Sequence, residues 1–106
     1  MTEIINGIQK LAREELIRAN NKKPLFASDH EAFGVLAEEV HETLDEAVQM
    51  DLWLDGFMSD VFNDNEDGKD KTVKKLRASA VLCAAEAVQV IAMCDKRMMS
   101  KEKDNE

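Results

Sequence analysis

Acidic residues recur in one stretch of the chain at spacings that bring carboxylates together. Glu38, Glu39 and Glu42 lie in a segment whose apolar residues recur every three or four positions, which is the spacing of an amphipathic helix. Because residues three and four apart share a helix face, Glu38 and Glu39 each project beside Glu42. A solvated acidic face is the simpler interpretation. Val40 and Leu44 flank these acids, however, so we expect some of them to lie at the edge of the core.

A further acid, Glu86, lies within the most apolar stretch of the chain, Ala78 to Cys94. Burial of a lone carboxylate is costly unless it is paired or bound to a metal. One interpretation is a buried salt bridge, and the candidate basic partners are Arg13, Lys74 and Arg77. The other is that Glu86 faces Glu39 and Glu42 across a helical bundle, where a divalent cation makes three gathered carboxylates tolerable. Ligands that offer only oxygen favour Mg²⁺ or Mn²⁺ over zinc.

Two stretches of the sequence resemble a known family when they are taken together. The run from Phe26 to Glu42 contains E-E-x-x-E at 38–42, and the run from Ala85 to Met93 contains Glu86 and Gln89 at the spacing of a second motif, E-x-x-D. This combination resembles the MazG-like branch of the all-α nucleoside triphosphate pyrophosphohydrolases, of the kind found in phages and Gram-positive bacteria. The resemblance covers about residues 26–97.

The resemblance implies a reaction and roles for particular residues. Glu39, Glu42 and Glu86 would hold Mg²⁺ or Mn²⁺, and Glu38 would be a further ligand or the base for the attacking water. The implied activity is hydrolysis of a nucleoside triphosphate to a monophosphate and pyrophosphate. A bound metal neutralises phosphate charge and lowers the pKa of its water, and this would resolve the charge conflict between an acidic protein and an anionic substrate.

Gln89 stands where the family has Asp. Its amide can still offer a carbonyl oxygen to the metal, so we count Gln89 among the candidate ligands. The substitution nevertheless removes one negative charge, and affinity for hard cations follows the charge of the ligands. Either the site binds metal weakly, or the chain keeps the fold without catalysis. The alternative function is therefore a non-catalytic MazG-like helical oligomer that acts as an interaction protein, with Glu86 and Gln89 as a buried polar pair between subunits.

The elements that position these residues are predicted to be helices. Apolar periodicity predicts a first helix from Thr2 to about Asn20 and a second from Asp29 to about Met50. Ser28 precedes the second helix as a capping residue. A short third helix or helical bend, broken at Gly56, is expected over 51–62.

The remainder of the chain is predicted to be a loop, a long helix and a tail. Residues 63–70 are polar and typical of a surface loop, and a last helix follows from about Lys71 to about Met98. That helix is apolar nearly all round, so it needs cover on several sides. The fold prediction is an all-α bundle of three long helices and a short one, in a single domain over 1–99 that is completed by self-association as a homo-dimer or homo-tetramer. Residues 100–106 are expected to form a disordered tail.

Composition restricts the environment and the partners. The 106 residues carry 22 acidic and 14 basic side chains, a formal charge of -8, which argues against binding to a nucleic acid polymer or an anionic membrane surface. Glu86 and Gln89 interrupt the apolar stretch, so we interpret it as a buried core helix and not a membrane span. Cys83 and Cys94 lie eleven residues apart on one predicted helix, too far to form a disulfide with each other. We therefore expect a cytoplasmic protein, and the resemblance to the MazG-like family implies that its ligand is a nucleoside triphosphate.

Overall fold

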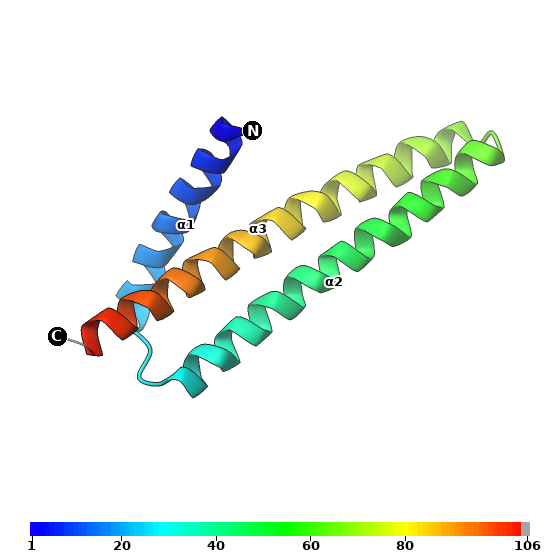
Figure 1. Cartoon of the computed structure of the whole chain (residues 1–106). Helices are drawn as coiled ribbons and strands as arrows, with labels where there is room; N and C mark the ends of the chain where they lie inside the picture. Colours follow the sequence, from blue (N-terminus) through cyan, green and yellow to red (C-terminus); the bar gives the residue numbers. More distant parts are fainter. Residues whose placement is uncertain (105–106) are drawn as a thin grey trace. The chain divides into compact units, whose positions relative to one another are not determined.

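The computed structural model describes residues 1–104 and contains three α-helices joined by short connections (Figure 1). These are α1 (Thr2–Lys22), α2 (Asp29–Phe62) and α3 (Glu66–Asp104). No strand occurs in this range, so the predicted all-α fold is confirmed. The start of α2 is also as predicted, because the Ser28 hydroxyl accepts a hydrogen bond from the backbone N–H of Glu31 at 3.2 Å.

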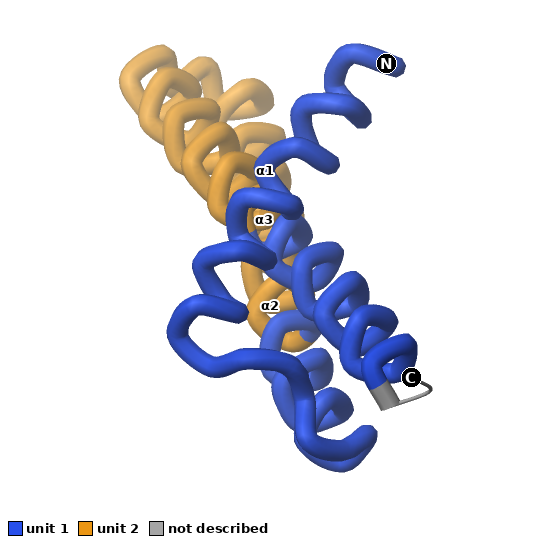
Figure 2. The backbone as a smooth tube through the Cα atoms, turned by 90° about the vertical axis from the view of Figure 1, so that its left-hand side faces the viewer, with its two compact units in different colours: residues 1–40, 86–106 blue, residues 41–85 orange. Residues whose placement is uncertain are grey.

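Two compact units divide the chain, and α2 and α3 each run through both without a break (Figure 2). Unit 1 comprises Met1–Val40 and the chain from Glu86 onward, and unit 2 comprises His41–Ala85. Unit 1 thus contains α1, the start of α2 and the end of α3, whereas unit 2 is a helical hairpin. The single domain predicted over 1–99 divides into these two units.

The separate short helix predicted over 51–62 does not exist. Instead, α2 continues through Gly56 to Phe62. A glycine costs a helix only about 1 kcal/mol relative to alanine, which contacts with α3 in the hairpin can offset. A Cβ atom at position 56 would lie 3.4 Å from Cγ2 of Thr72, so Gly56 lies directly against α3.

The end of α2 has the hydrogen-bond pattern of a left-handed helix cap. The N–H of Asn65 donates to the carbonyl of Asp60 at 2.9 Å, and the N–H of Asp64 donates to the carbonyl of Val61 at 3.3 Å. Between them Asp64 has a φ of 51°. These are the two bonds of a Schellman motif, whose left-handed position is usually glycine.

The predicted loop over 63–70 and the predicted helix start at Lys71 are both wrong, because α3 begins at Glu66. The Asn65 side chain accepts a hydrogen bond from the N–H of Gly68 at 3.2 Å and so caps the helix. Glu66 and Asp67 lie in the first turn, where negative charge is favourable. The polar residues that suggested a loop therefore form the cap and first turn of α3.

The predicted disordered tail from residue 100 is wrong for the described residues, because α3 continues to Asp104. Ser100 is buried, and its hydroxyl accepts a hydrogen bond from the backbone N–H of Phe26 at 2.8 Å while donating to the carbonyl of Lys96 at 2.7 Å. This contact with the α1–α2 connection orders the last turns of α3. Residues 105–106 of the predicted tail lie outside the described residues.

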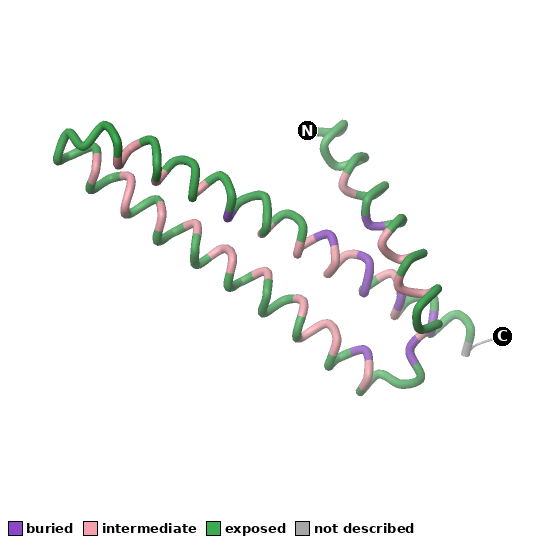
Figure 3. Tube along the Cα trace, turned by 180° about the vertical axis from the view of Figure 1, so that it is seen from behind, coloured by how far each residue is buried: buried purple, intermediate pink, exposed green. Residues whose placement is uncertain are grey.

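Unit 1 is organised around one row of buried residues on α3. Val88, Ala92, Lys96 and Ser100 are spaced four residues apart, and all four are buried. Ala92 of this row belongs to the hydrophobic core, together with Phe26 from the connection, Ala32 from α2 and Met93 from α3. Figure 3 shows the buried residues gathered mainly in the parts of the chain that belong to unit 1. This row therefore holds α1, α2 and their connection in place within unit 1.

Unit 2 leaves much of its apolar surface uncovered. Ser79 is its one buried residue among those described. By length and composition α3 is apolar enough to cross a membrane, and only 22% of its most apolar window is buried. Such a helix fits either the core helix of a soluble protein or a membrane span.

The left-handed residue at the end of α2 generates a stability prediction. We expect Asp64→Gly to raise the free energy of unfolding by about 1 kcal/mol, because glycine adopts this conformation without a Cβ clash. The increase should appear as a higher melting temperature. Asp55→Gly, at an exposed position inside α2, is the matched control and should lower it. A lower melting temperature for Asp64→Gly would show that the Asp64 side chain stabilises the turn.

Candidate metal centre

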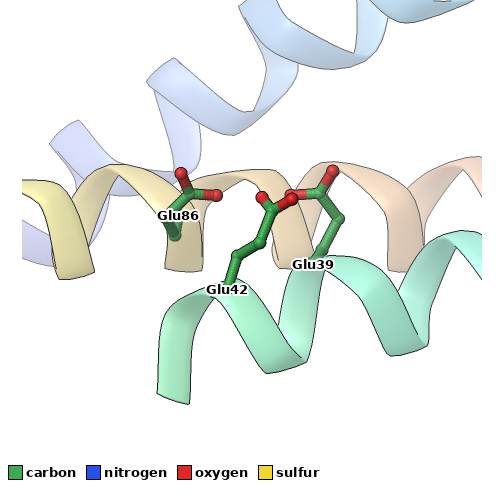
Figure 4. A group of neighbouring side chains, drawn as sticks. All are labelled: Glu39, Glu42 and Glu86. Atoms are coloured by element: carbon green, nitrogen blue, oxygen red, sulfur yellow. The ribbon is translucent and has the colours of Figure 1, made fainter. Parts of the chain in front are cut away.

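Three carboxylates from α2 and α3 approach one another closely. Glu39 and Glu86 belong to unit 1, and Glu42 follows Glu39 by one turn on the same unbroken helix. Each offers an oxygen, and these atoms all lie within 4.8 Å of one another. Figure 4 shows Glu39 and Glu42 rising from α2 toward Glu86 on α3. We call these three residues the carboxylate cluster.

The donor set of the carboxylate cluster suits a hard divalent cation. Mg²⁺ binds oxygen at about 2.0–2.1 Å in an octahedron, so neighbouring ligand oxygens lie about 3 Å apart and opposite ones about 4.2 Å apart. The separations in the cluster reach this range with small side-chain movements. The absence of nitrogen and sulfur from the cluster also matches Mg²⁺ or Mn²⁺ better than zinc.

The expected deep burial of Glu86 is not found. Glu86 and Glu39 are half-buried, and Glu42 is exposed. Within residues 1–104 no ion pair joins Glu86 to any of the basic residues considered as partners, Arg13, Lys74 and Arg77. Glu86 thus keeps part of its hydration, because the apolar stretch around it is only partly covered.

Glu38 is placed differently from the cluster. It is exposed on α2 and does not belong to the group of three. Successive residues of a helix are rotated by about 100°, so Glu38 cannot share the direction of Glu39. It precedes Glu42 by one turn, which places it beside the cluster on the solvent side.

Gln89 is engaged by a residue that the sequence interpretation missed. Its Nε2 donates a hydrogen bond to Oε2 of Glu15 on α1 at 2.8 Å, and both residues are half-buried in unit 1. Gln89 follows Glu86 by three residues, so the two share a face of α3. Sequence could have indicated Glu15, because it lies three residues after Ala12 and four before Ala19, on the apolar face of α1.

A buried lysine lies further along α3, at the α1–α2 connection. The Nζ of Lys96 donates to the carbonyl of Lys23 at 2.9 Å and lies 4.8 Å from the centroid of the Phe26 ring. Burial lowers the pKa of Lys96 below its usual value of 10.5, the nearby Glu31 carboxylate raises it, and Lys23 lowers it further. Lys96 therefore fastens the connection and has no contact that assigns it to the carboxylate cluster.

A small cavity lies near this connection and not at the cluster. Its volume is about 80 Å³, and it is lined by Phe26, Ser28, Asp29, Arg97, Ser100 and Lys101. Ligand pockets usually measure about 300–1,000 Å³, so this cavity cannot enclose a nucleoside triphosphate.

Comparison with known proteins provides no relative: no family model, no curated protein and no solved structure matches the chain. The resemblance to the MazG-like enzymes therefore depends on the residues of the two motifs. The geometry brings together Glu39, Glu42 and Glu86 from those motifs.

Like charge in the cluster generates a prediction for the metal-free protein. In a chelator we expect Glu86→Gln to raise the free energy of unfolding by about 1 kcal/mol, because it removes one of three neighbouring negative charges. The gain should shrink between about 10 mM and 1 M salt, since screening weakens the repulsion. Glu14→Gln, an exposed acid on α1, is the control and should change stability little. A loss of more than about 2 kcal/mol would instead identify Glu86 as a structural residue.

Proposed function

We propose that this protein is a Mg²⁺- or Mn²⁺-dependent nucleoside triphosphate pyrophosphohydrolase. The observation that carries the proposal is the meeting of Glu39, Glu42 and Glu86, whose oxygens lie within 4.8 Å of one another. Gln89, one turn beyond Glu86, would add a neutral oxygen. The motif spacing links this set of ligands to the MazG-like reaction, in which a triphosphate and water give a monophosphate and pyrophosphate.

The residues of the cluster would hold the metal, and the charge balance supports this assignment. A protein with a formal charge of -8 repels a triphosphate unless cations intervene. When bound, the metal supplies neutralisation of phosphate charge and a water of lowered pKa. Glu39 and Glu86 bring charge from two helices, and the half-exposed position of Glu86 leaves one side accessible to substrate.

Glu38 is the residue that we assign to proton transfer. In the reaction an oxygen of water bonds to phosphorus, the P–O bond between the monophosphate and pyrophosphate parts breaks, and one proton of the water must leave. Glu38 is exposed and one turn from Glu42, so it can accept this proton without being a metal ligand.

The second candidate function is a non-catalytic helical oligomer of MazG-like fold. The observation that favours it is the hydrogen bond from Gln89 to Glu15, which gives Gln89 a structural partner. This partner lies within the chain, whereas the sequence interpretation expected one in a second subunit. In this alternative the carboxylate cluster would carry no catalytic metal, and the exposed apolar surface would be the functional feature.

Metal binding and turnover test the two functions separately. We expect Mn²⁺ at about 100 times its Kd to stabilise the protein by about 2.7 kcal/mol, because a ligand of the native state alone shifts the folding equilibrium. Pyrophosphate release should accompany it for some member of a nucleotide panel. Glu42→Gln should abolish both effects, whereas Glu38→Gln should retain stabilisation and lose turnover.

Asp45→Asn provides the control for these variants, because it removes a charge from an exposed position of the same helix outside the cluster. It should preserve both metal stabilisation and turnover. Absence of stabilisation by Mn²⁺ and Mg²⁺ would refute the metal site. Stabilisation without pyrophosphate release from any nucleotide would favour the non-catalytic alternative.

We propose further that a second copy of the chain covers the apolar surface of unit 2. Leu44, Val48 and Leu52 recur every four residues on α2 and are 55%, 56% and 55% exposed. The accessible surface of the chain is 7702 Å², whereas a monomer of this mass ordinarily exposes about 6,000 Å². The excess is of the size that one chain buries in a permanent dimer.

A homo-dimer or homo-tetramer would also support the cytoplasmic location that we propose. Association would bury the apolar window of α3 as a core helix, with no need for lipid. Cys83 and Cys94 are both free, as is usual in a reducing compartment.

Self-association is tested by a charge placed among the exposed apolar residues of α2, Leu44, Val48 and Leu52. We expect the purified chain to sediment as a dimer or tetramer without detergent, and Leu52→Glu to shift it toward monomer because a buried carboxylate opposes the contact. Gln49→Glu adds the same charge at an exposed position outside this group and should leave the assembly intact. A monomer that binds to lipid vesicles would contradict the proposal and favour a membrane span.

A further inference from the structure

The contact between α1 and Gln89 has a direction that chemistry determines. An ionised carboxylate only accepts hydrogen bonds, so the end of the Gln89 amide that meets Glu15 must be the NH₂ group. The 2.8 Å bond from Nε2 to Oε2 of Glu15 matches this requirement. In a planar amide the carbonyl oxygen lies on the other side of the carbon from this contact. The Gln89 carbonyl oxygen is therefore not the atom that meets Glu15.

Gln89 lies on the same face of α3 as Glu86 of the carboxylate cluster. It is one turn beyond Glu86, and both are half-buried residues of unit 1. The Glu15 carboxylate does not belong to the cluster itself. It accepts a hydrogen bond from the Gln89 amide instead, as a supporting acceptor does for a metal ligand.

The charge of Glu15 can act through this amide. A hydrogen bond from the NH₂ group to an anion shifts electron density toward the carbonyl oxygen, and linked hydrogen bonds polarise one another. Outer carboxylates support metal-binding imidazoles in a comparable way, by orienting the ligand and raising its basicity. Here the Gln89 ligand is neutral, so the nearby charge of Glu15 restores part of the electrostatic attraction to the cation that an aspartate at position 89 would supply.

We propose that Glu15 and Gln89 act together as the fourth ligand of the metal, with Gln89 offering its carbonyl oxygen and Glu15 serving as the positioning residue that orients and polarises it. This inference rests on the proposed metal site. According to this proposal, a residue of α1 affects the affinity for the cation. Glu15 lies outside both sequence motifs.

The positive charge of Arg18 opposes the effect of Glu15 on the Gln89 carbonyl. A variant of Arg18 should therefore change metal affinity in the direction opposite to a variant of Glu15. Its Nη1 donates to Oε1 of Glu15, so the same carboxylate is shared between Arg18 and Gln89. The Arg18 side chain is 64% exposed, so its removal uncovers little surface. Loss of this cation leaves more negative charge on Glu15, and Arg18→Gln should therefore tighten metal binding.

The test measures the affinity of the full chain for Mn²⁺, read from the paramagnetic resonance signal of the free ion. Glu15→Gln should weaken binding about tenfold, the lower end of the effect of removing a partner of a metal ligand. Glu14→Gln removes the same charge from the adjacent exposed position and should stay within about twofold of the unchanged protein. In a Gln89→Met background, Glu15→Gln should cause no additional loss. Arg18→Gln should bind Mn²⁺ more tightly than its matched control Arg13→Gln.

Amide hydrogen exchange of α1 separates this role from simple attachment of the helix. Unchanged protection of α1 together with weaker Mn²⁺ binding by Glu15→Gln supports the proposal. Equal affinities for Glu15→Gln and Glu14→Gln overturn it and leave Glu15 as an anchor of α1. If Glu15→Gln loosens α1, the comparison of Arg18→Gln with Arg13→Gln decides, and equal affinities overturn the proposal. If the unchanged protein binds no Mn²⁺, the proposed metal function itself is wrong and this inference is lost with it.

Discussion

The burial of one row on α3 is the constraint on which the organisation of unit 1 depends. Val88, Ala92, Lys96 and Ser100 recur at four-residue spacing and are all buried. Ala92 is completely covered, and its small side chain permits close approach of its neighbours. Lys96 and Ser100 bind the backbone of the α1–α2 connection at Lys23 and Phe26. Polar groups can occupy this row because each has a hydrogen-bond partner there.

The same packing brings the polar residues of the candidate site together. Once the connection is fastened to α3, the start of α2 and the end of α1 both lie against it within unit 1. Glu39 then meets Glu86, and Glu15 meets Gln89. These four residues are half-buried. In the proposed metal site, partial burial would strengthen electrostatic attraction to a cation, and partial exposure would allow the proposed anionic substrate to reach it.

Unit 2 buries much less of its apolar surface than unit 1 does. A hairpin of two helices can bury only the seam between them, and here the seam contains Gly56 against Thr72 and the buried Ser79. The outer faces keep large apolar side chains exposed, so this unit has an unmet demand for cover. Self-association would meet that demand.

A large part of this structure could be predicted from the sequence, because it depends on the periodicity of apolar residues and on local helix caps. The all-α fold and the start of α2 after Ser28 depend on residues within one or two turns of each other, so they could be predicted. The E-E-x-x-E spacing likewise predicted that Glu39 and Glu42 share a face, because helix geometry alone dictates it. The end of α2 and the start of α3 are also local, but Asp64 and Asn65 suit a loop and a pair of helix caps equally well, and the loop prediction was wrong.

Tertiary structure alone decided the features that join distant parts of the chain. Ser100 is helical and buried because it binds the backbone of Phe26, 74 residues away. Gln89 finds its partner Glu15 across the same separation, and Glu86 keeps part of its hydration because too few helices cover the apolar stretch around it. Spacing along a helix determines which residues share a face, whereas the partner of that face depends on how separate helices pack. The residues of the candidate site could therefore be predicted from the sequence, whereas their partners on other helices are determined by packing.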